Sequence, residues 1–250
     1  MKKKFTISVV TATWNAENHL PRLIESIRNQ TDKDFNWIVA DGLSTDGTLN
    51  ILKELKDIRL QIISKSDFGI YDALNRGIKL AKSDYYLVVG ADDYLDPRAV
   101  ENYRRVAIEA GGPDIVASAV KVGENIITPK SGLGWFYGMP GVASSHSVGL
   151  LIKCSLHDRF GFYSRKLPIA ADQLFIKTVL MKNGSIVRCD FVSGEFSKQG
   201  VSGQDDWGLI TELFRVQIET ERWMFLQLML LVLRCLKCYL SKLLFKKQIN

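Results

Sequence analysis

Carboxylate side chains gather at the points where the predicted strands end. Asp41 and Asp46 follow the second apolar run of the chain, Asp67 follows the third, and Asp92 and Asp93 follow the fourth. In open α/β sheets the carboxyl ends of parallel strands meet at one edge, so we expect these acids to lie near one another. Their mutual repulsion would be costly unless a cation or hydrogen-bond donors compensate it. The spacing therefore predicts a polar site at that edge.

Acids in this arrangement suit a divalent cation. Mg²⁺ and Mn²⁺ prefer oxygen ligands, and a pair of carboxylates with a bound diphosphate is a common way to hold them. The chain contains neither Gly-x-x-x-x-Gly-Lys-Ser/Thr nor Gly-x-Gly-x-x-Gly, so neither motif supplies a phosphate site. Taken singly, each acid also fits a turn or a helix N-cap, and only the joint placement favours a site.

The elements that must position these residues alternate between strand and helix patterns. Expected strands are 5–13, 35–40, 60–65, 85–90, 114–120, 148–153 and 186–192. Expected helices lie near 20–27, 49–55, 71–81, 97–107 and 172–183. Such alternation predicts an α/β fold with a mostly parallel, Rossmann-like sheet flanked by helices.

Composition and charge restrict the class of protein. The 250 residues are 46% hydrophobic and 24% charged, which excludes collagen, low complexity and disorder. Six of the 33 Lys and Arg lie after Glu221 and no acid does, so residues 1–221 hold 27 basic and 27 acidic residues. A neutral body predicts no nucleic-acid partner. The four scattered cysteines are expected to be unpaired and reduced, as in a cytoplasmic protein.

Residues 222–250 form a separate basic and apolar segment. The eleven residues from Trp223 to Leu233 are broken only by Gln227, and this uncharged run is shorter than the roughly 20 residues that span a bilayer. A polar stripe runs along the segment: Gln227, Arg234 and Ser241, with Lys237 and Lys242 beside them. The pattern predicts an amphipathic helix that lies on an anionic membrane at the inner face of the plasma membrane. Packing on the domain or in a homodimer is the alternative.

An ordered set of motifs resembles family 2 glycosyltransferases over residues 5–205. The motifs are Ser8-Val-Val-Thr-Ala-Thr-Trp-Asn15, Asp41-Gly-Leu-Ser-Thr-Asp-Gly-Thr48, Asp67-Phe-Gly-Ile-Tyr-Asp-Ala-Leu-Asn-Arg-Gly77, Ala91-Asp-Asp93, Ser145-His146, Ala170-Ala-Asp172 and Phe196-Ser-Lys-Gln-Gly-Val-Ser202. They are similar to the bacterial exopolysaccharide and O-antigen branch, including colanic acid biosynthesis enzymes. This resemblance implies a GT-A fold in residues 1–221 and inverting transfer from a nucleotide-diphosphate sugar to a saccharide or lipid-linked acceptor.

The resemblance also implies roles for individual residues. Asp172 falls at the catalytic base, while Asp92 and Asp93 fall at the Mg²⁺ or Mn²⁺ motif, with Asp93 expected to be the direct ligand. Nucleotide and donor contacts are implied for Thr13, Trp14, Asn15, Asp41, Asp67 and Asn75, with Asp41 on the base. His146 and Lys198 are candidate contacts to the sugar or diphosphate. Without the resemblance, Asp172 could be a helix N-cap, His146 a loop histidine and Lys198 a solvated lysine.

Two other functional classes fit part of the pattern. A nucleotide-sugar-binding or scaffold subunit would keep the fold without turnover, and the aromatic loop around residues 132–141 would then bind a protein partner. That loop contains Trp135, Phe136 and Tyr137 within a Gly- and Ser-rich stretch, which favours a binding loop over a packed crossover. A nucleotidyltransferase also uses strand-end acids and a cation. It would need a Gly-rich basic loop after the first strand, and Thr11–Asn15 contains no glycine.

Overall fold

The computed structural model describes residues 4–197 and 205–249, with side chains as far as residue 243. The strands are β1 (Ile7–Thr13), β2 (Phe35–Asp41), β3 (Leu60–Ser64), β4 (Tyr85–Val88), β5 (Tyr94–Leu95), β6 (Ile115–Val122), β7 (Asn125–Ile127), β8 (Leu150–Lys153) and β9 (Ile186–Phe196). The helices are α1 (Leu20–Arg28), α2 (Thr48–Glu54), α3 (Ile70–Leu80), α4 (Ala99–Glu109), α5 (Gly134–Tyr137), α6 (Leu156–Phe160), α7 (Ala171–Met181), α9 (Asp206–Thr220) and α10 (Met224–Ile249).

The described strands form one mixed sheet in the order β3-β2-β1-β4-β8-β6-β9-β5, with β7 beside β6. Strands β3, β2, β1 and β4 are parallel, as the alternating pattern predicts. Strand β8 is antiparallel to both β4 and β6. Parallel neighbours need a long crossover connection, usually a helix, and the segment between β6 and β8 carries only β7 and short helical turns. The sheet is therefore less parallel in its second half than expected.

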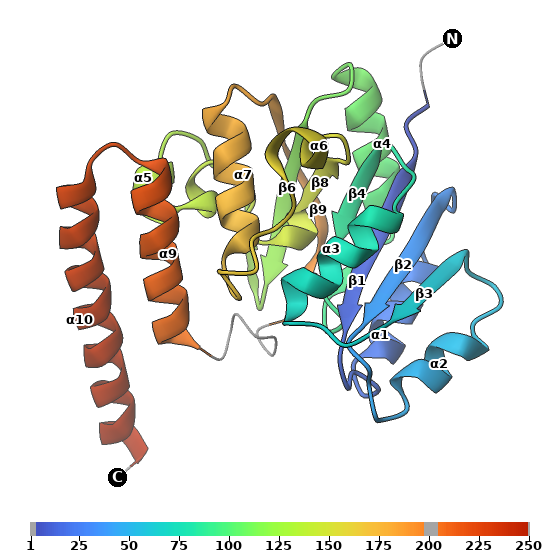
Figure 1. Ribbon diagram of the computed structural model, residues 1–250, viewed down its shortest axis with the longest axis horizontal. Coiled ribbons are helices and arrows are strands. Elements are labelled where there is room, and N and C mark those ends of the chain that lie inside the picture. The colour runs from blue at the N-terminus through green and yellow to red at the C-terminus, as the bar shows by residue number, and fades with distance from the viewer. Residues whose placement is uncertain (1–3, 198–204, 250) are drawn as a thin grey trace.

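Helices cover both faces of the sheet (Figure 1). On one face α1 and α4 pack apolar residues such as Leu23 and Tyr103 against the sheet, and on the other face α3 and α7 do so with Leu74 and Ile176. Strand β1 lies between these layers and is almost entirely buried. This burial on both faces explains its continuous apolar sequence. The first strand, predicted over residues 5–13, is thus a core strand. The four cysteines are unpaired, as expected.

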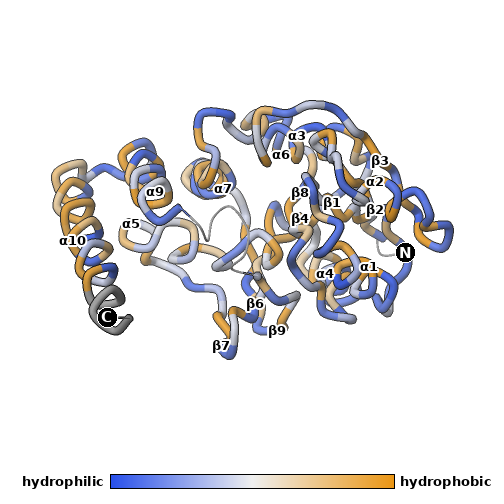
Figure 2. Tube along the Cα trace, turned by 90° about the horizontal axis from the view of Figure 1, so that it is seen from below, coloured by the Kyte–Doolittle hydropathy of each residue, from blue (hydrophilic) through white to orange (hydrophobic). Residues whose placement is uncertain are grey.

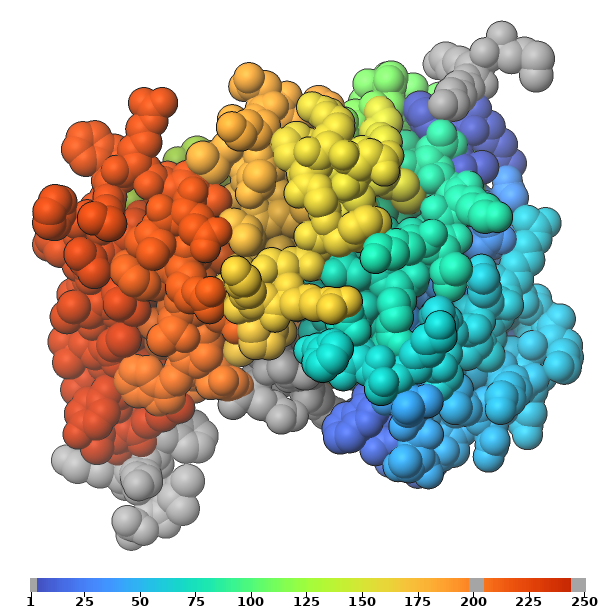
Figure 3. Space-filling model, viewed as in Figure 1, coloured from blue at the N-terminus to red at the C-terminus, as the bar shows by residue number. Residues whose placement is uncertain are grey.

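The C-terminal helix α10 packs on α9, and together they form one end of the molecule (Figures 1 and 3). The short helix α5 lies against this pair, and its backbone carbonyls accept side-chain hydrogen bonds from it. Gln217 of α9 donates to Gly134 O at 2.9 Å and to Trp135 O at 3.0 Å. Gln227 of α10 donates to Trp135 O at 2.8 Å, and Arg234 donates to Phe136 O. The ends of these long polar side chains therefore fix α9 and α10 on α5.

Gln227 and Arg234 of the polar stripe consequently face the protein, whereas Ser241 and the opposite, apolar face of α10 are exposed. Gln227 is fully buried and Arg234 is partly buried. Along the outward face, Val232 is 66% exposed and Leu236 52% exposed, and Figure 2 shows how apolar this helix is. Within the described chain, Met224–Leu243 is the one helix that is long and apolar enough to cross a membrane, by length and composition alone. The predicted boundary at residue 221 coincides with the turn between α9 and α10 and stays a prediction.

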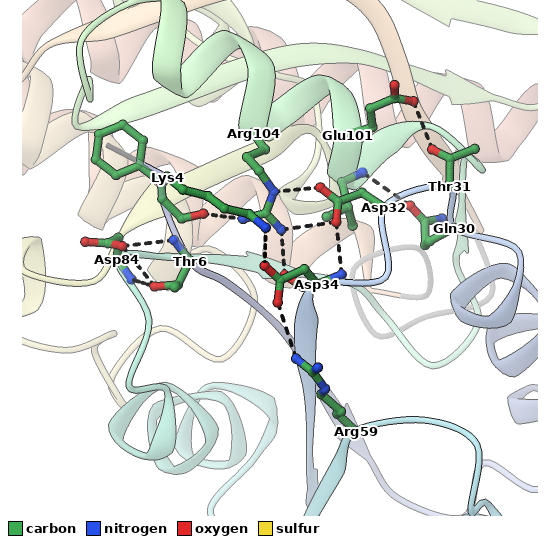
Figure 4. A network of polar contacts seen from close by, with 12 residues as sticks. Lys4, Thr6, Gln30, Thr31, Asp32, Asp34, Arg59, Asp84, Glu101 and Arg104 are labelled. Carbon is green, nitrogen blue, oxygen red and sulfur yellow. Dashed lines mark hydrogen bonds and ion pairs between the residues drawn. The ribbon is translucent and has the colours of Figure 1, made fainter. Parts of the chain in front are cut away.

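A buried arginine ties α4 to the start of β1 and to the loop before β2 (Figure 4). The Arg104 guanidinium donates to Asp32 at 2.6 Å, to Asp34 O at 2.5 Å and to Phe5 O. Arg104 is only 6% exposed, so its charge depends on these partners. Burial alone would raise the pKa of Asp32, but the Arg104 hydrogen bond helps to hold it below its ordinary value.

Replacing Arg104 with Met should destabilise the fold by about 2–4 kcal/mol, because Asp32 and two backbone carbonyls lose their donor. Urea unfolding followed by circular dichroism measures the change. Arg105→Met is the matched control, since Arg105 pairs on the surface with Glu109 four residues later. The Arg105→Met control should lower the free energy of unfolding by less than about 0.5 kcal/mol. Equal effects of the two substitutions would contradict the anchoring role of Arg104.

Candidate functional site

The loops after β1, β2 and β3 converge near Gly42, and three of the predicted donor-site residues, Trp14, Asn15 and Asp67, lie in them. A Cβ atom on Gly42 would lie 2.6 Å from Asp67 Oδ2 and 3.5 Å from Trp14 Cδ1, so only glycine allows this approach. Trp14 is 70% exposed. Asn15 adopts a positive φ of 47° and accepts a hydrogen bond from Thr45 N at 2.8 Å. Asp67 is also paired with Arg76 at 3.2 Å. The structure thus brings these loops together, with an aromatic ring open to a ligand.

Asp41 is the buried organiser of that edge. Its Oδ1 accepts from Thr13 at 3.1 Å and from Ser44, and its Oδ2 accepts from Ser64 at 2.8 Å and from Ser44 N at 3.0 Å. The side chain is fully buried. Burial alone would raise the pKa of Asp41, but these hydrogen bonds hold it below its ordinary value. Direct contact with a nucleotide base would require Ser44 or Ser64 to give up its bond, so this predicted contact is not made by a free oxygen.

Asn75, for which a donor contact is predicted, is hydrogen-bonded within the protein at both ends of its amide. Its Nδ2 donates to Tyr163 O at 2.9 Å, and its Oδ1 accepts from Tyr163 N at 3.0 Å. The residue is only 6% exposed, and it does not line the cavity described below. Both ends of the amide are therefore occupied by one residue's backbone. Asn75 thus fastens α3 to the loop before α7, and its donor contact stays a prediction.

A cavity of about 300 Å³ brings together the remaining predicted acids and His146. Asp92 and Asp93 enter it from the loop after β4, His146 from the turn before β8, and Asp172 from the first turn of α7. Its other walls are largely apolar and include Phe196, Ile169 and Met139. A volume of this size suits a small ligand or a sugar ring. Lys198, the last predicted contact, lies outside the described residues.

The two adjacent acids are held very differently. Asp93 is 1% exposed, with one oxygen accepting from Ser197 N and the other from Gly90 N, both at 3.0 Å. Burial raises the pKa of Asp93 to about 7, and the neighbouring Asp92 charge contributes to this rise. Asp92 Oδ2 is buried and has no hydrogen-bond partner among the described residues. The unpartnered oxygen on Asp92 is thus more open to a cation than either oxygen of Asp93, the residue expected to be the direct ligand.

Within the described ranges, no three His, Cys, Asp or Glu side chains are grouped to hold a metal ion on their own. The orphan oxygen of Asp92 beside Asp93 nevertheless fits a hard divalent cation, which prefers carboxylate oxygens. Ligands for the remaining positions would have to come from a bound molecule such as a diphosphate. The described residues therefore fit Mg²⁺ or Mn²⁺ only when a bound substrate supplies the remaining ligands.

His146 lies between the acids of the cavity. Its Nδ1 is 3.9 Å from Asp93 Oδ2, which is too long for a hydrogen bond, and its ring stacks on Phe196 with centroids 3.8 Å apart. Burial lowers the pKa of His146 to about 4, so the ring is neutral near pH 7. Nδ1 faces the backbone N–H of Val148 at 3.4 Å, and this contact favours the tautomer with the proton on Nε2. A neutral imidazole of this kind can donate one hydrogen bond to a ligand.

Asp172 is the second residue of α7, whose N-cap is Ala170, so it is not the helix cap. Its Oδ1 accepts from the Tyr71 hydroxyl and from Gln173 N, both at 2.8 Å. Burial raises the pKa of Asp172 above its ordinary value, and the Tyr71 hydrogen bond opposes this rise. A carboxylate with raised pKa in an apolar cavity has the properties of a general base.

Several residues in or next to the cavity were given no role by the sequence analysis. Tyr71 belongs to the motif at 67–77, but its position reads as a core residue of an amphipathic helix. Ser145 and Gln173 each present a buried side-chain oxygen with no partner among the described residues, and both line the cavity. Glu212 of α9 accepts from Ile169 N and Ala170 N at 2.9 and 2.8 Å and so holds the chain leading into α7. No signal in the sequence links Glu212 to Asp172.

Comparison with known proteins decides the family. A family model described as glycosyl transferase family 2 matches residues 8–151, which is more than half of the chain. The chain belongs to glycosyl transferase family 2. A PGL/p-HBAD biosynthesis glycosyltransferase of Mycobacterium tuberculosis H37Rv is 43% identical over 91 residues, 35% of this chain and 36% of that protein. Chondroitin synthase of Escherichia coli is 34% identical over 103 residues, 40% of this chain and 15% of that protein.

The chain thus matches about a third or less of the length of these family 2 relatives. Solved structures confirm the GT-A fold over a larger share. Staphylococcus aureus TarS 1–349 in complex with UDP-GlcNAc has a TM-score of 0.69 at 18% identity, covering 90% of this chain and 70% of that one. The mannosyltransferase PcManGT of Pyrobaculum calidifontis with GDP-Man and Mn²⁺ has a TM-score of 0.66 at 17% identity, covering 88% and 66%. The finer resemblance to colanic acid enzymes is not confirmed by these comparisons.

Gly90 offers a test of the carboxylate pair in this family 2 chain. A Cβ atom there would lie 2.8 Å from Asp93 Oδ2 and 3.0 Å from Asp92 Oδ1. Gly90→Ala should therefore displace both carboxylates and weaken Mn²⁺-dependent nucleotide binding by roughly tenfold or more. Isothermal titration calorimetry with UDP and GDP, with and without Mn²⁺, measures the effect.

Gly123→Ala is the control for the Gly90 substitution. Gly123 lies in the turn between β6 and β7, has a φ of +59° and open space around its Cα, and does not line the cavity. It should cost about 1 kcal/mol of stability without changing nucleotide binding. Unchanged binding in a folded Gly90→Ala variant would show that the position of these carboxylates does not matter for the nucleotide.

Proposed function

We propose that the chain transfers a sugar, with inversion, from a nucleotide-diphosphate donor to a saccharide hydroxyl. One observation carries this proposal: a single cavity contains the carboxylate pair Asp92 and Asp93 and, on a separate element, the raised-pKa carboxylate Asp172. The pair suits the diphosphate end of a donor, and Asp172 suits the acceptor end. UDP-GlcNAc and GDP-Man, the donors named for the structural neighbours, support this class of substrate.

The reaction needs one proton transfer and one displacement. The acceptor oxygen forms a bond to the anomeric carbon as its proton moves to Asp172, and the bond from that carbon to the diphosphate breaks. The nucleoside diphosphate leaves with the electron pair, and because the acceptor oxygen attacks from the opposite face in a single displacement, the anomeric configuration inverts. The neutral His146 ring can donate a hydrogen bond from Nε2 to an oxygen of the nucleotide sugar without adding a charge to the site.

Asp92, with its unpartnered oxygen, and Asp93 would hold Mg²⁺ or Mn²⁺ together with the diphosphate. When bound, such an ion stabilises the negative charge of the departing diphosphate. Asp93 with a pKa of about 7 would be half protonated near neutral pH without a cation. Cation binding favours the ionised form, so nucleotide binding that depends on the metal should strengthen as pH rises through this range.

Asp172→Asn should abolish transfer, because the amide cannot take up the acceptor proton, while donor binding persists. Binding is measured as a thermal shift with UDP, GDP, dTDP and CMP, each with and without Mn²⁺. Transfer is measured as release of the nucleoside diphosphate with a lipid extract of the source cells as acceptor. In the wild type, activity should fall as pH drops through the raised pKa of Asp172, because only the ionised carboxylate acts as a base.

Full transfer activity in Asp172→Asn would show that Asp172 is not the catalytic base. Nucleotide binding without turnover in the wild type, even with the lipid extract, would instead favour a nucleotide-sugar-binding or scaffold subunit. The absence of any metal-dependent shift in folded protein would limit the family relationship to the fold.

We further propose that the outward face of α10 binds the cytoplasmic face of an anionic membrane and that the acceptor is lipid-linked, as in cell-surface polysaccharide synthesis. The exposed apolar face of α10 supports this, as does the absence of acidic residues after Glu221. Lys237 is exposed beside this face, where it can contact anionic headgroups. Trp223, which is 73% exposed at the start of the helix, suits the bilayer interface.

Leu236→Asp should reduce binding to vesicles of phosphatidylcholine and phosphatidylglycerol by at least about tenfold, since it removes apolar contact and adds repulsion. Ile126→Asp is the matched control, because Ile126 is 61% exposed on β7, away from α10. Cosedimentation measures binding, and light scattering measures mass. The wild type could instead be a dimer that does not bind vesicles and that Leu236→Asp dissociates. That result would mean that a second copy of the chain covers this face.

A further inference from the structure

The two oxygens of Asp172 have different surroundings. Oδ1 accepts from the Tyr71 hydroxyl and from Gln173 N, both at 2.8 Å. Oδ2 accepts no hydrogen bond from the described residues, and Asp172 lines the cavity. One oxygen is thus held by the protein, and the other is left for a ligand. A base that must meet an acceptor hydroxyl in one orientation needs this asymmetry.

Tyr71 is itself firmly placed. It lies in the first turn of α3, is 8% exposed, and packs its ring edge-on against Tyr163 with centroids 5.4 Å apart. Its hydroxyl oxygen is 2.8 Å from Asp172 Oδ1 and 2.9 Å from Ile169 O. Burial raises the pKa of Tyr71 well above its ordinary value, so the hydroxyl keeps its proton. Tyr71 is therefore a permanent donor at a fixed position.

The position between two acceptors suits both protonation states of Asp172. A single O–H group donates one strong hydrogen bond. While Asp172 is ionised, the carboxylate is the stronger acceptor, and the Tyr71 proton stabilises its charge. Once Asp172 has taken a proton on Oδ2, the Tyr71 proton can turn to Ile169 O instead. Neither state leaves the buried hydroxyl without an acceptor.

We propose that Tyr71 is a positioning residue for sugar transfer. By donating to Oδ1 of Asp172, it directs Oδ2 toward the acceptor hydroxyl and favours the ionised carboxylate. This inference rests on the proposed role of Asp172 as the base. The other titratable groups around Asp172 are His146 before β8, Asp92 and Asp93 after β4, Tyr86 on β4, Tyr163 before α7, and Glu212 on α9 beneath the Ile169–Ala170 backbone.

Tyr71→Phe keeps the ring and removes only the hydroxyl. The turnover number should fall by roughly 10- to 100-fold, while the KM for the donor changes little, because the Tyr71 hydroxyl bonds to Asp172 and not to Asp92 or Asp93, the pair proposed to hold the diphosphate. The acid limb of the pH profile should move up by about one unit, since the ionised carboxylate loses a donor and its pKa rises. Activity is measured as release of UDP from UDP-GlcNAc or of GDP from GDP-mannose, with a lipid extract of the source cells as acceptor.

Tyr85→Phe is the matched control. Its hydroxyl also donates from a fully buried ring, to Pro113 O at 2.6 Å, but Tyr85 does not line the cavity. The two variants should lose similar thermal stability, whereas only Tyr71→Phe should change turnover and the pH profile. Equal activity losses at equal stability would mean that Tyr71 is merely structural.

A titration without substrate tests the same contact. Carboxyl carbon NMR of protein labelled at aspartate follows Asp172 against pH, with its signal assigned by loss in Asp172→Asn. Tyr71→Phe should raise the measured pKa of Asp172 by about one unit relative to the wild type and to Tyr85→Phe. An unchanged pKa together with an unchanged pH profile overturns the positioning role. Inactive Asp172→Asn would then leave the proposed function intact, whereas active Asp172→Asn removes both.

Discussion

The cost of burying carboxylates at one edge of a sheet is the constraint on which this site depends. Parallel pairing of β1 with β2 and β4 brings several acids to that edge, where Asp41 and Asp93 are buried. Asp41 is compensated by hydroxyl and backbone donors, and its pKa is held low. Asp93 and Asp172 have fewer donors, and burial raises the pKa of both. Asp41, whose charge is compensated, supports the loops. Asp93 and Asp172 lack such compensation, and a cation or an acceptor hydroxyl can supply it.

The requirement that buried polar groups have hydrogen-bond partners also explains the orientation of the C-terminal helix. In the short helix α5 only Gly134 O accepts from a backbone donor of the described chain, Gly138 N at 2.9 Å, because the carbonyls of a last turn have no partner further along the helix. Gln217, Gln227 and Arg234 supply donors to these carbonyls. Lys177 of α7 adds a bond to Gly134 O at 3.2 Å and pairs with Glu221 at 2.5 Å. Polar contacts therefore fix α10, and its apolar residues are left on the outside.

The sequence allowed the main strands and the acidic edge to be predicted, because strand ends and periodic helices follow from local patterns. A site that joins Asp92 and Asp93 with His146 and Asp172 was implied only by the resemblance to family 2 glycosyltransferases. The sequence could not show that Asn75 clamps the Tyr163 backbone, since a buried amide and a ligand-binding amide look alike in sequence. Helix α9 was missed because its buried residues include Glu212 and Gln217, which blur its apolar face. The stripe on α10 was recognised, but a stripe facing headgroups and one facing α5 have the same spacing.

The position of α5 connects the exposed apolar surface to the cavity. The backbone of α5 holds α9 and α10, and the turn that follows it, Met139–Gly141, contributes Met139 and Pro140 to the cavity wall. On the opposite side of that wall, Glu212 of α9 holds the two backbone amides just before Asp172. Helix α9, on which α10 packs, therefore contacts the chain that leads to Asp172 on the base side of the cavity. A lipid-linked acceptor entering along α9 and α10 would reach Asp172 without crossing the donor edge.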